Sequence, residues 1–497
     1  MMATGARLLL ALLCGLLLAA GFAPFNGFWI PVLALGVVFS LLGANRRGGE
    51  AFALGYLFGL GYAGLGVYWI FHSIADYGGG PLAASVATAV LVALFALIPA
   101  LALTLGWWVG RHWRRGMYLL ALPLAWIWVE WVRSWFLTGA TWLSLGYTQV
   151  DTPLGAYAPW LGVYGPGLAV ALMAGALAWW LRRPLSRRLA ESLVVIVIVS
   201  TGGLLLPSQW GQPAGEPLTV ALLQGNIEQS RKWDPDERSA IVGEYAALTR
   251  EHFGADLIVW PETALPVFYK GAEDWLQSLA GEARAAGSTL VLGAPVARGE
   301  QRFNAVAIPG ETPQFYFKRH LVPFGEYVPF RDAAGGILDF VGTPLGDFEP
   351  GTSAAPLMAA GQPLGVSICY EVTFGAELAD ALPAARILLN VSNDAWFGRS
   401  SAPWQHLQMA RMRALETGRP MIRATNTGVS AVIAADGELK ATTPLFQRAV
   451  LRGEVTPREG ATPYVRWRDW PLAGVSTALL VGLLVTGRRR FALFRQL

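Results

Sequence analysis

This chain has little charge for its length. Asp, Glu, Lys and Arg make up 14% of its 497 residues, hydrophobic residues make up 54%, and the mean hydropathy is +0.42. Soluble globular domains carry about 25% charged residues, so an ordinary soluble protein is excluded. The net charge is only +4, and the hydrophilic part shows no arginine-rich stripe interleaved with aromatic residues. We therefore expect no nucleic-acid partner.

Cysteine is almost missing, since the chain has only Cys14 and Cys369. Cys14 lies in an apolar run near the N-terminus and Cys369 in the hydrophilic part, which excludes a disulfide framework. The five histidines show no spacing that suits zinc. We expect no metal and no cofactor, so any chemistry in this chain has to come from ordinary side chains.

Long hydrophobic runs are what the chain has instead. A membrane span needs about 20 mostly apolar residues. Seven runs precede residue 207 and one follows residue 469, which predicts a polytopic α-helical membrane domain with eight spans. The first run lacks a convincing small-residue cleavage site and is interpreted as a retained helix. The candidate spans are residues 8–23, 28–42, 51–70, 82–109, 117–137, 161–181, 189–206 and 470–486.

Arginines mark every second loop between these runs. The loops after the first, third and fifth spans contain no Lys or Arg, whereas arginines follow the second, fourth, sixth and eighth. By the positive-inside rule, both termini lie in the cytoplasm and the long segment between the last two spans lies outside. In a bacterium, outside means the periplasm. The marking arginines are Arg46, Arg47, Arg111, Arg114, Arg115, Arg182, Arg183, Arg187, Arg188, Arg488, Arg489 and Arg490.

A hydrophilic α/β domain interrupts the membrane pattern. We expect a transmembrane domain at 1–206, a linker at 207–216, the α/β domain at 217–457, and an interfacial segment, last span and tail at 458–497. Short apolar strands alternate with amphipathic helices in this domain, which indicates one sheet-based fold covered by helices. The expected strands are 218–223, 257–260, 289–293, 305–308, 314–318, 363–369, 387–391, 422–425 and 430–433, and the expected helices are 236–252, 272–286, 374–381 and 404–415.

Three reactive side chains each follow a predicted strand. Glu262 follows the strand 257–260, Lys318 ends the strand 314–318, and Cys369 ends the strand 363–369. The ends of strands are where α/β folds collect chemistry. A thiol that attacks an acyl group needs a base and a cation nearby. Cys369 supplies the thiol, Glu262 the base and Lys318 the cation. An unpaired thiol in an oxidising compartment is a liability unless it is buried or used.

The hydrophilic part resembles the nitrilase superfamily at Trp260-Pro261-Glu262, Lys318 and Cys369-Tyr370-Glu371. Members of that superfamily use a Glu–Lys–Cys triad in an αββα sandwich. With the predicted spans around it, the whole chain is similar to the apolipoprotein N-acyltransferase family. Three further segments carry this resemblance: Gln224-Gly225-Asn226-Ile227, His320 to Glu326, and Ser392 to Gly398.

The resemblance implies a reaction with two lipid substrates at the bacterial inner membrane. A phospholipid, commonly phosphatidylethanolamine, would give its acyl chain to Cys369 as a thioester. The α-amino group of a diacylglyceryl-apolipoprotein would then receive it as an amide. Glu262 would be the base, and Lys318 would stabilise the oxyanion, with a backbone N–H near Tyr370. Glu326 and Glu371 are expected to support these residues, and Trp233 to line the substrate site.

A long Gly-rich stretch from Phe330 to Phe348 has no clear periodicity, which is typical of a lid or binding loop. Its residues Ile337, Leu338 and Phe340 are expected to flank the substrate entry.

Two other functions stay open on the sequence alone. A membrane-anchored amidase of the nitrilase type would pass the acyl group to water. A transporter could carry a degenerate nitrilase-like binding domain, although the presence of all three triad residues argues against it. A cysteine thioester that persists until an amine arrives would distinguish the acyltransferase from both.

Overall fold

A computed structural model describes residues 3–43, 47–76, 80–182, 186–207, 210–327 and 348–496, with side chains to residue 487. The chain forms two compact units. A helical unit comprises Met1–Phe71, Pro81–Ser208 and Trp467–Leu497. An α/β unit comprises His72–Gly80 and Gln209–Arg466. The short segment His72–Gly80 lies in sequence between two stretches of the helical unit but belongs to the α/β unit.

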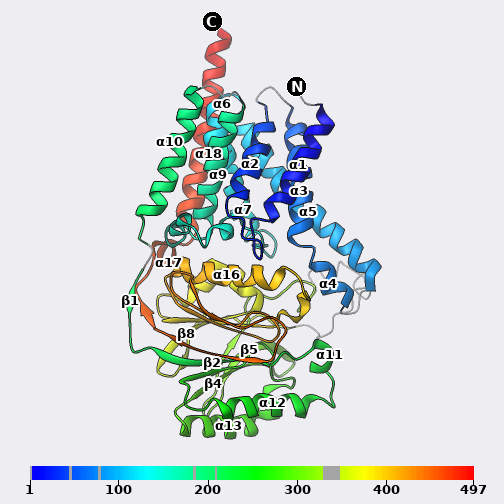
Figure 1. Cartoon of the computed structure of the whole chain (residues 1–497), viewed down its shortest axis with the longest axis vertical. Helices are drawn as coiled ribbons and strands as arrows, with labels where there is room; N and C mark the ends of the chain where they lie inside the picture. The colour runs from blue at the N-terminus through cyan, green and yellow to red at the C-terminus, as the bar shows by residue number, and fades with distance from the viewer. Residues whose placement is uncertain are drawn as a thin grey trace. The chain divides into compact units, whose positions relative to one another are not determined.

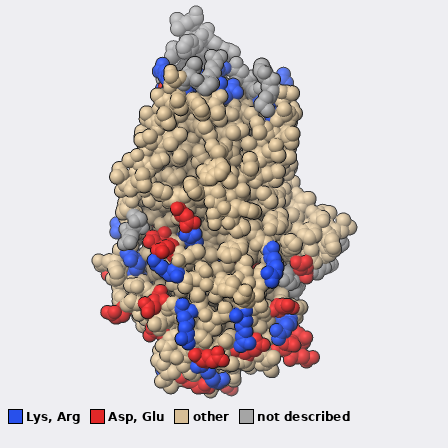
Figure 2. Space-filling view, in the orientation of Figure 1, with Lys and Arg blue, Asp and Glu red and all other residues tan. Residues whose placement is uncertain are grey.

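The helical unit is built from apolar helices, as the hydrophobic runs predict (Figure 1). In Figure 2 the visible face of this unit is free of charged side chains over much of its length, whereas the α/β unit carries many of both signs. Its longer helices are α1 (Thr4–Ala19), α2 (Ile30–Leu41), α3 (Gly48–Gly66), α5 (Gly80–Gly110), α7 (Leu122–Arg133), α9 (Tyr164–Leu181), α10 (Ser186–Leu205) and α18 (Trp470–Gln496).

Four helices within the described residues are long and apolar enough to cross a membrane. They are α5, α9, α10 and the Trp470–Gly487 part of α18, while α1 and α2 are apolar but shorter. The run expected at 117–137 is divided, because a π-helical turn, Met117–Ala121, precedes α7, and α7 ends at Arg133. Several apolar helices are thus confirmed, and the count of eight spans stays a prediction.

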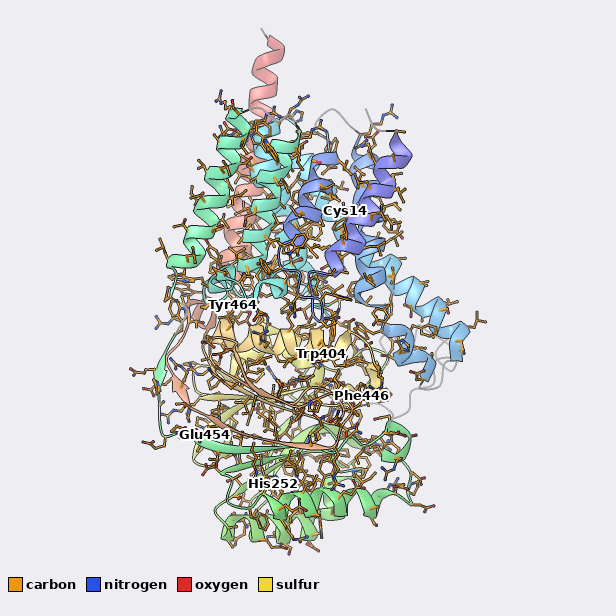
Figure 3. All side chains as sticks on the ribbon, in the orientation of Figure 1. Cys14, His252, Trp404, Phe446, Glu454 and Tyr464 are labelled. Carbon is orange, nitrogen blue, oxygen red and sulfur yellow. The ribbon has the colours of Figure 1, made fainter. Side chains whose placement is uncertain are left out.

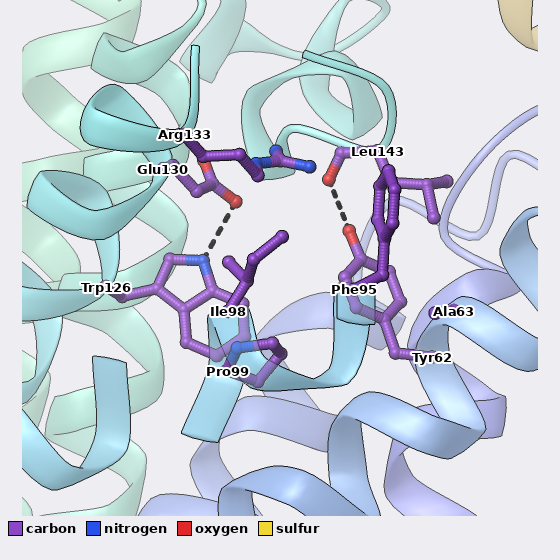
Figure 4. A pocket seen from close by; sticks show the side chains of 9 residues that line it. All are labelled: Tyr62, Ala63, Phe95, Ile98, Pro99, Trp126, Glu130, Arg133 and Leu143. Carbon is purple, nitrogen blue, oxygen red and sulfur yellow. Dashed lines mark hydrogen bonds between the residues drawn. The ribbon is translucent and has the colours of Figure 1, made fainter. Parts of the chain in front are cut away.

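Two ionisable side chains of α7 lie inside the helical unit and fasten the segment that follows the helix. Glu130 accepts hydrogen bonds from Trp126 Nε1 at 3.0 Å and from the backbone N–H of Leu145 at 3.1 Å. Arg133 donates to the carbonyl of Trp142 at 2.6 Å and to Ser144 Oγ at 3.0 Å. Both residues line a small pocket, shown in Figure 4. Both side chains are therefore held by hydrogen bonds to neighbouring residues of the helical unit.

The α/β unit contains two six-stranded sheets with the orders β13-β2-β3-β4-β5-β6 and β12-β11-β10-β9-β8-β7. A two-stranded ribbon pairs β1 with β14. The strands are β1 (Gln212–Pro213), β2 (Leu218–Gln224), β3 (Leu257–Val259), β4 (Thr289–Arg298), β5 (Gln301–Ile308), β6 (Gln314–Phe317), β7 (Leu357–Ala359), β8 (Gln362–Ile368), β9 (Ile387–Ser392), β10 (Met421–Thr425), β11 (Ala431–Ile433), β12 (Leu439–Thr442), β13 (Ala449–Val455) and β14 (Arg458–Glu459).

Three apolar clusters hold these layers together. One cluster joins side chains of both sheets, such as Leu222 of β2 and Leu389 of β9, so the sheets pack face to face. A second lies between the first sheet and the helices α12 (Arg238–Glu251) and α13 (Glu273–Ala285). A third lies between the second sheet and α16 (Ala402–Thr417). The helices thus cover the two outer faces (Figure 1), which confirms the predicted nitrilase-like α/β domain.

The carboxyl ends of the central strands meet at one edge of each sheet. Strands β2, β3 and β4 are parallel, and β6 shares their direction because both β4 and β6 run antiparallel to β5. Strands β8, β9 and β10 are parallel in the other sheet. Asn426, after β10, donates from Nδ2 to the Ile227 carbonyl at 2.7 Å and accepts from the Ile227 N–H at 2.9 Å. These bonds join the two sheets at the edge where the predicted reactive residues lie.

Candidate active site

Glu262 is held on both of its carboxylate oxygens. It follows β3 in a tight turn and is 7% exposed. Its Oε1 accepts a hydrogen bond from Asn304 Nδ2 at 2.8 Å, and its Oε2 accepts one from the Asn393 backbone N–H at 2.8 Å. Asn304 belongs to β5 and Asn393 follows β9, so both sheets contribute to the orientation of this carboxylate.

Lys318 lies between two carboxylates. Its Nζ is 2.8 Å from Glu326 Oε2 and 3.8 Å from Glu262 Oε1, and the side chain is 1% exposed. Burial alone would lower the pKa of Lys318, but the negative charges of Glu326 and Glu262 raise it well above its ordinary value. Lys318 therefore remains an ammonium at working pH, able to stabilise negative charge but unable to act as a base.

Glu326 is the second carboxylate at Lys318 and is fixed by the backbone as well. Its Oε2 accepts from the Val322 N–H at 2.8 Å, and its Oε1 accepts from Asn304 Nδ2 at 3.0 Å. The amide of Asn304 thus bridges Glu262 and Glu326, which share Lys318 between them.

Cys369 follows β8 directly and opens the 3-10 turn η7 (Cys369–Thr373). Its φ of +50° lies in the left-handed region, which is uncommon for a residue other than glycine. Burial and the charge of Glu262 raise the pKa of the Cys369 thiol, and Lys318 opposes the rise only in part. The resting group is therefore a thiol, and a thiol becomes a strong nucleophile only when a base removes its proton.

Glu371 ties the cysteine turn to the lysine segment. It is 5% exposed and accepts hydrogen bonds from Ile368 N–H at 2.7 Å, Arg319 N–H at 2.6 Å and Tyr316 Oη at 3.0 Å. Ile368 precedes Cys369, while Arg319 follows Lys318. Burial raises the pKa of Glu371, opposed by Lys318 and by the backbone donors. Glu371 thus links two of the three predicted triad residues through their neighbours.

A buried polar cluster supports the cysteine turn from behind. His406 of α16 donates from Nε2 to the Cys369 carbonyl at 3.1 Å, and its Nδ1 lies 3.0 Å from Asp394 Oδ1. Arg423 of β10 donates from Nη2 to Asp394 Oδ2 at 3.0 Å. Burial alone would raise the pKa of Asp394, but Arg423 and His406 lower it to about 2. The cluster fixes the left-handed backbone of Cys369.

The remaining predicted site residues are placed as follows. Tyr370 packs its ring against His320 and Phe374, with centroid separations of 5.7 and 5.0 Å. Trp233 follows α11 (Gln229–Lys232), and its buried Nε1 has no hydrogen-bond partner within the described part of the chain. Ile337, Leu338 and Phe340 lie outside the described residues.

Cys14 lies in α1 of the helical unit (Figure 3), so Cys369 is the thiol of the α/β unit. Where the structure describes the chain, no group of three His, Cys, Asp or Glu side chains could hold a metal ion.

Sequence comparisons find relatives that match both units of the chain. The chain matches the family model described as apolipoprotein N-acyltransferase N-terminal domain at residues 14–176 and the carbon-nitrogen hydrolase model at residues 219–464. It is 46% identical to the apolipoprotein N-acyltransferase of Methylococcus capsulatus, covering 98% of this chain and 97% of that protein. The chain belongs to the apolipoprotein N-acyltransferase family.

Other members of the apolipoprotein N-acyltransferase family are similarly close. The one from Pseudomonas syringae pv. tomato is 43% identical over 97% of both chains. Among solved structures, a carbon-nitrogen hydrolase from Helicobacter pylori is 19% identical with a TM-score of 0.37, covering 52% of this chain and 94% of that one.

Asn304 and Lys232 are among the site residues of this family member that were not predicted from its sequence. Asn304 bridges Glu262 and Glu326, and Lys232 donates from Nζ to Thr263 Oγ1 at 2.6 Å beside Glu262. Asn304 is a polar residue in the buried and otherwise apolar part of β5, residues 303–308, and this break in the pattern is a signal that could have identified it. Lys232 adjoins Trp233, but its local sequence gives no sign that it is buried.

Proposed function

We propose that this chain transfers a fatty acyl group from a phospholipid to the α-amino group of the N-terminal diacylglyceryl-cysteine of apolipoproteins. The observation that carries the proposal is the arrangement of Glu262, Lys318 and Cys369 at the carboxyl ends of β3, β6 and β8. The family to which the chain belongs supports both the acyl transfer and its lipoprotein acceptor. Phosphatidylethanolamine is the donor that we propose.

In the first half-reaction, Glu262 takes the thiol proton while Cys369 Sγ attacks the ester carbonyl carbon of the phospholipid. A tetrahedral intermediate forms, and the ammonium of Lys318 stabilises its oxyanion. When the carbon–oxygen bond breaks, Glu262 returns the proton to the leaving lysophospholipid alkoxide. The products are a thioester on Cys369 and a neutral lysophospholipid.

In the second half-reaction, the lipoprotein amine attacks the thioester carbonyl carbon. Glu262 accepts a proton from the amine, Lys318 again stabilises the oxyanion, and the carbon–sulfur bond breaks. The proton passes to the leaving sulfur, which restores the Cys369 thiol, and the acyl group remains on the acceptor as an amide.

The apolar helices support a membrane location for both substrates and enzyme. We propose eight spans in the bacterial inner membrane, with the α/β unit in the periplasm and both termini in the cytoplasm. The alternation of arginine-bearing loops supports this orientation. Domain limits of 1–206, 217–457 and 458–497, with a linker at 207–216, belong to the same proposal.

The test is to incubate purified protein with phosphatidylethanolamine labelled in its acyl chain. We expect a hydroxylamine-sensitive adduct on Cys369 that persists in water and disappears when an amine acceptor is added. Rapid loss of the adduct to free fatty acid without an amine would instead indicate an amidase-like hydrolase.

Cys369→Ala should abolish the adduct while the melting temperature stays close to wild type, because the change removes one small group. Cys14→Ala is the matched control and should form the adduct normally. An adduct that survives in Cys369→Ala would contradict the assignment of the nucleophile.

A further inference from the structure

A second lysine lies buried beside the proposed base. Lys232 ends α11 and is 2% exposed. Its Nζ donates to Thr263 Oγ1 at 2.6 Å and to the Glu262 backbone carbonyl at 3.2 Å. A buried ammonium is unfavourable unless it is paired and hydrogen-bonded. The proposed reaction assigns no step to Lys232, so the burial of its side chain requires an explanation.

The turn that Lys232 contacts has a strained backbone. Thr263 has a φ of +44°, and a positive φ is a genuine outlier for a β-branched residue. Strand β4 closes the other side of the turn, since a Cβ at Gly293 would lie 2.4 Å from the Pro261 carbonyl oxygen. Strain of this kind persists only where the surroundings enforce it. The two hydrogen bonds from Lys232 hold this turn in its strained conformation.

The charge of Lys232 also acts on the reacting groups. Burial lowers its pKa to about 8, and the negative charge of Glu262, together with that of Cys369 once it is ionised, limits the decrease. Lys232 is therefore mostly protonated at neutral pH. Glu262, in the turn after β3, and Cys369, at the end of β8, are the ionisable groups that interact electrostatically with it. Glu228 and Arg231 are the charged groups on its own segment. Arg231 is paired with Glu237 at 2.6 Å.

We propose that Lys232 is a positioning residue of this active site, which holds the Glu262–Thr263 turn in place and whose positive charge favours the ionised form of Cys369. The inference rests on the proposed function, because it assigns Lys232 a role in the activation of Cys369. Its two parts are separable: the hydrogen bond to Thr263 serves position, and the charge serves ionisation.

The experiment measures how fast iodoacetamide alkylates Cys369 in the full-length Cys14→Ala protein, from pH 5 to 9. This readout needs no phospholipid, so it reports on Lys232 even if the proposed acyl transfer fails. Labelled phosphatidylethanolamine is tested in parallel. Absence of a thioester in the wild-type protein would reject the function and leave the alkylation result standing.

Lys232→Met should slow alkylation at pH 7 by about 10-fold to 100-fold, the range expected when a catalytic group is displaced by up to 1 Å. The acid limb of the rate should also move to higher pH by about one unit, because a positive charge that favours the Cys369 thiolate is lost. Thr263→Val removes the hydroxyl and keeps the charge, so it should slow alkylation without moving the acid limb. Lys440→Met, at an exposed lysine of β12, is the matched control and should change neither.

Lys232→Met with the wild-type rate and pH profile would overturn the proposal. An equal slowing by Lys232→Met and Thr263→Val with no shift of the acid limb would also overturn it, because the lysine would then be structural only. If Lys232→Met melts well below wild type, Lys232→Arg decides the question. That variant keeps the charge, and an acid limb displaced from the wild-type position in a folded Lys232→Arg protein would contradict the role of the charge.

Discussion

Glu262 shows how far a single side chain in this site is constrained. Each carboxylate oxygen accepts a hydrogen bond, one from a side-chain amide of β5 and one from a backbone N–H after β9. The carboxylate therefore cannot rotate without losing a bond that is buried. A base held in this way loses little entropy when the substrate arrives, which is the advantage of a preorganised site.

Glu262→Gln should slow thioester formation by at least about 100-fold, the lower end of the range for general acid–base catalysis. The amide cannot accept the thiol proton, and its NH₂ group would face one of the two donors that the carboxylate now accepts. Rapid-quench measurement of the labelled adduct gives the rate, and a thermal melt checks the fold. Wild-type acylation by a folded Glu262→Gln protein would show that another group removes the proton.

At the scale of the elements, the junction between β8 and η7 depends on Glu371. This carboxylate accepts hydrogen bonds from four donors. Tyr316 Oη of β6 donates to it, as do the backbone N–H groups of Arg319 and His320, which follow β6, and of Ile368, which ends β8. A carboxylate accepts from all of them, whereas an amide would present its own hydrogens to at least one.

We therefore expect Glu371→Gln to lower the free energy of unfolding by about 1–3 kcal/mol, the cost of leaving a buried donor unsatisfied. Thioester formation should fall as well, because Cys369 and Lys318 are positioned through this link. Chemical denaturation measures the first effect and adduct formation the second. An unchanged unfolding midpoint would mean that the junction is held by other contacts.

His406 gives the α16–β10 region a predictable response to acid. Burial and the charge of Arg423 lower its pKa below the ordinary 6.5. At pH values between the lowered pKa and 6.5, His406 binds a proton in the unfolded chain but not in the folded chain. The free energy of unfolding therefore falls as the pH drops below about 6.5. One proton contributes a slope of at most about 1.4 kcal/mol per pH unit.

Thermal melts between pH 7 and 5 should therefore show a loss of stability that is smaller in His406→Gln. The glutamine side chain is neutral throughout and retains an N–H group for the Cys369 carbonyl. An equal loss in both proteins would assign the acid sensitivity to other groups.

The sequence predicted the elements well where they are apolar and continuous. Strands β2, β8 and β9 lie within one residue of their expected limits, because each is buried along nearly its whole length. Strands β7, β12 and β13 were not predicted. They lie toward the sheet edges and are partly exposed, so their mixed composition gives no continuous apolar run.

The residues of the site, like the strands, were predicted only in part. The strand ends predicted Glu262, Lys318 and Cys369, and the sequence also predicted Glu326 and Glu371 beside them, whereas it did not predict the contacts of Glu262 with Asn304 and Asn393. Asn304 lies 42 residues from Glu262 in sequence, and Asn393 lies 131 residues away. Asn304 reaches Glu262 through the strand order of one sheet and Asn393 through the stacking of the two sheets, and single-sequence patterns carry no information about either.

At the scale of the whole molecule, the orientation in the membrane is open to a direct test. In a background that carries both Cys14→Ala and Cys369→Ala, Lys440→Cys should react with a membrane-impermeant maleimide added to intact spheroplasts. Arg187→Cys, at the highly exposed start of α10, should react only after the membrane is permeabilised. The reverse labelling pattern would contradict the proposed periplasmic location of the α/β unit.

The proposed reaction has a consequence for the charge of the groups around Cys369. Glu262 and Glu326 are carboxylates, Lys318 and Lys232 are ammonium groups, and the resting Cys369 is a neutral thiol. In the proposed reaction, the negative charge of Glu262 passes to the oxyanion as the proton moves the other way, so the net charge of these groups does not change from thiol to thioester. An acyl chain that displaces water from this site therefore leaves no newly formed net charge in a medium of low dielectric, where such a charge would be most unfavourable.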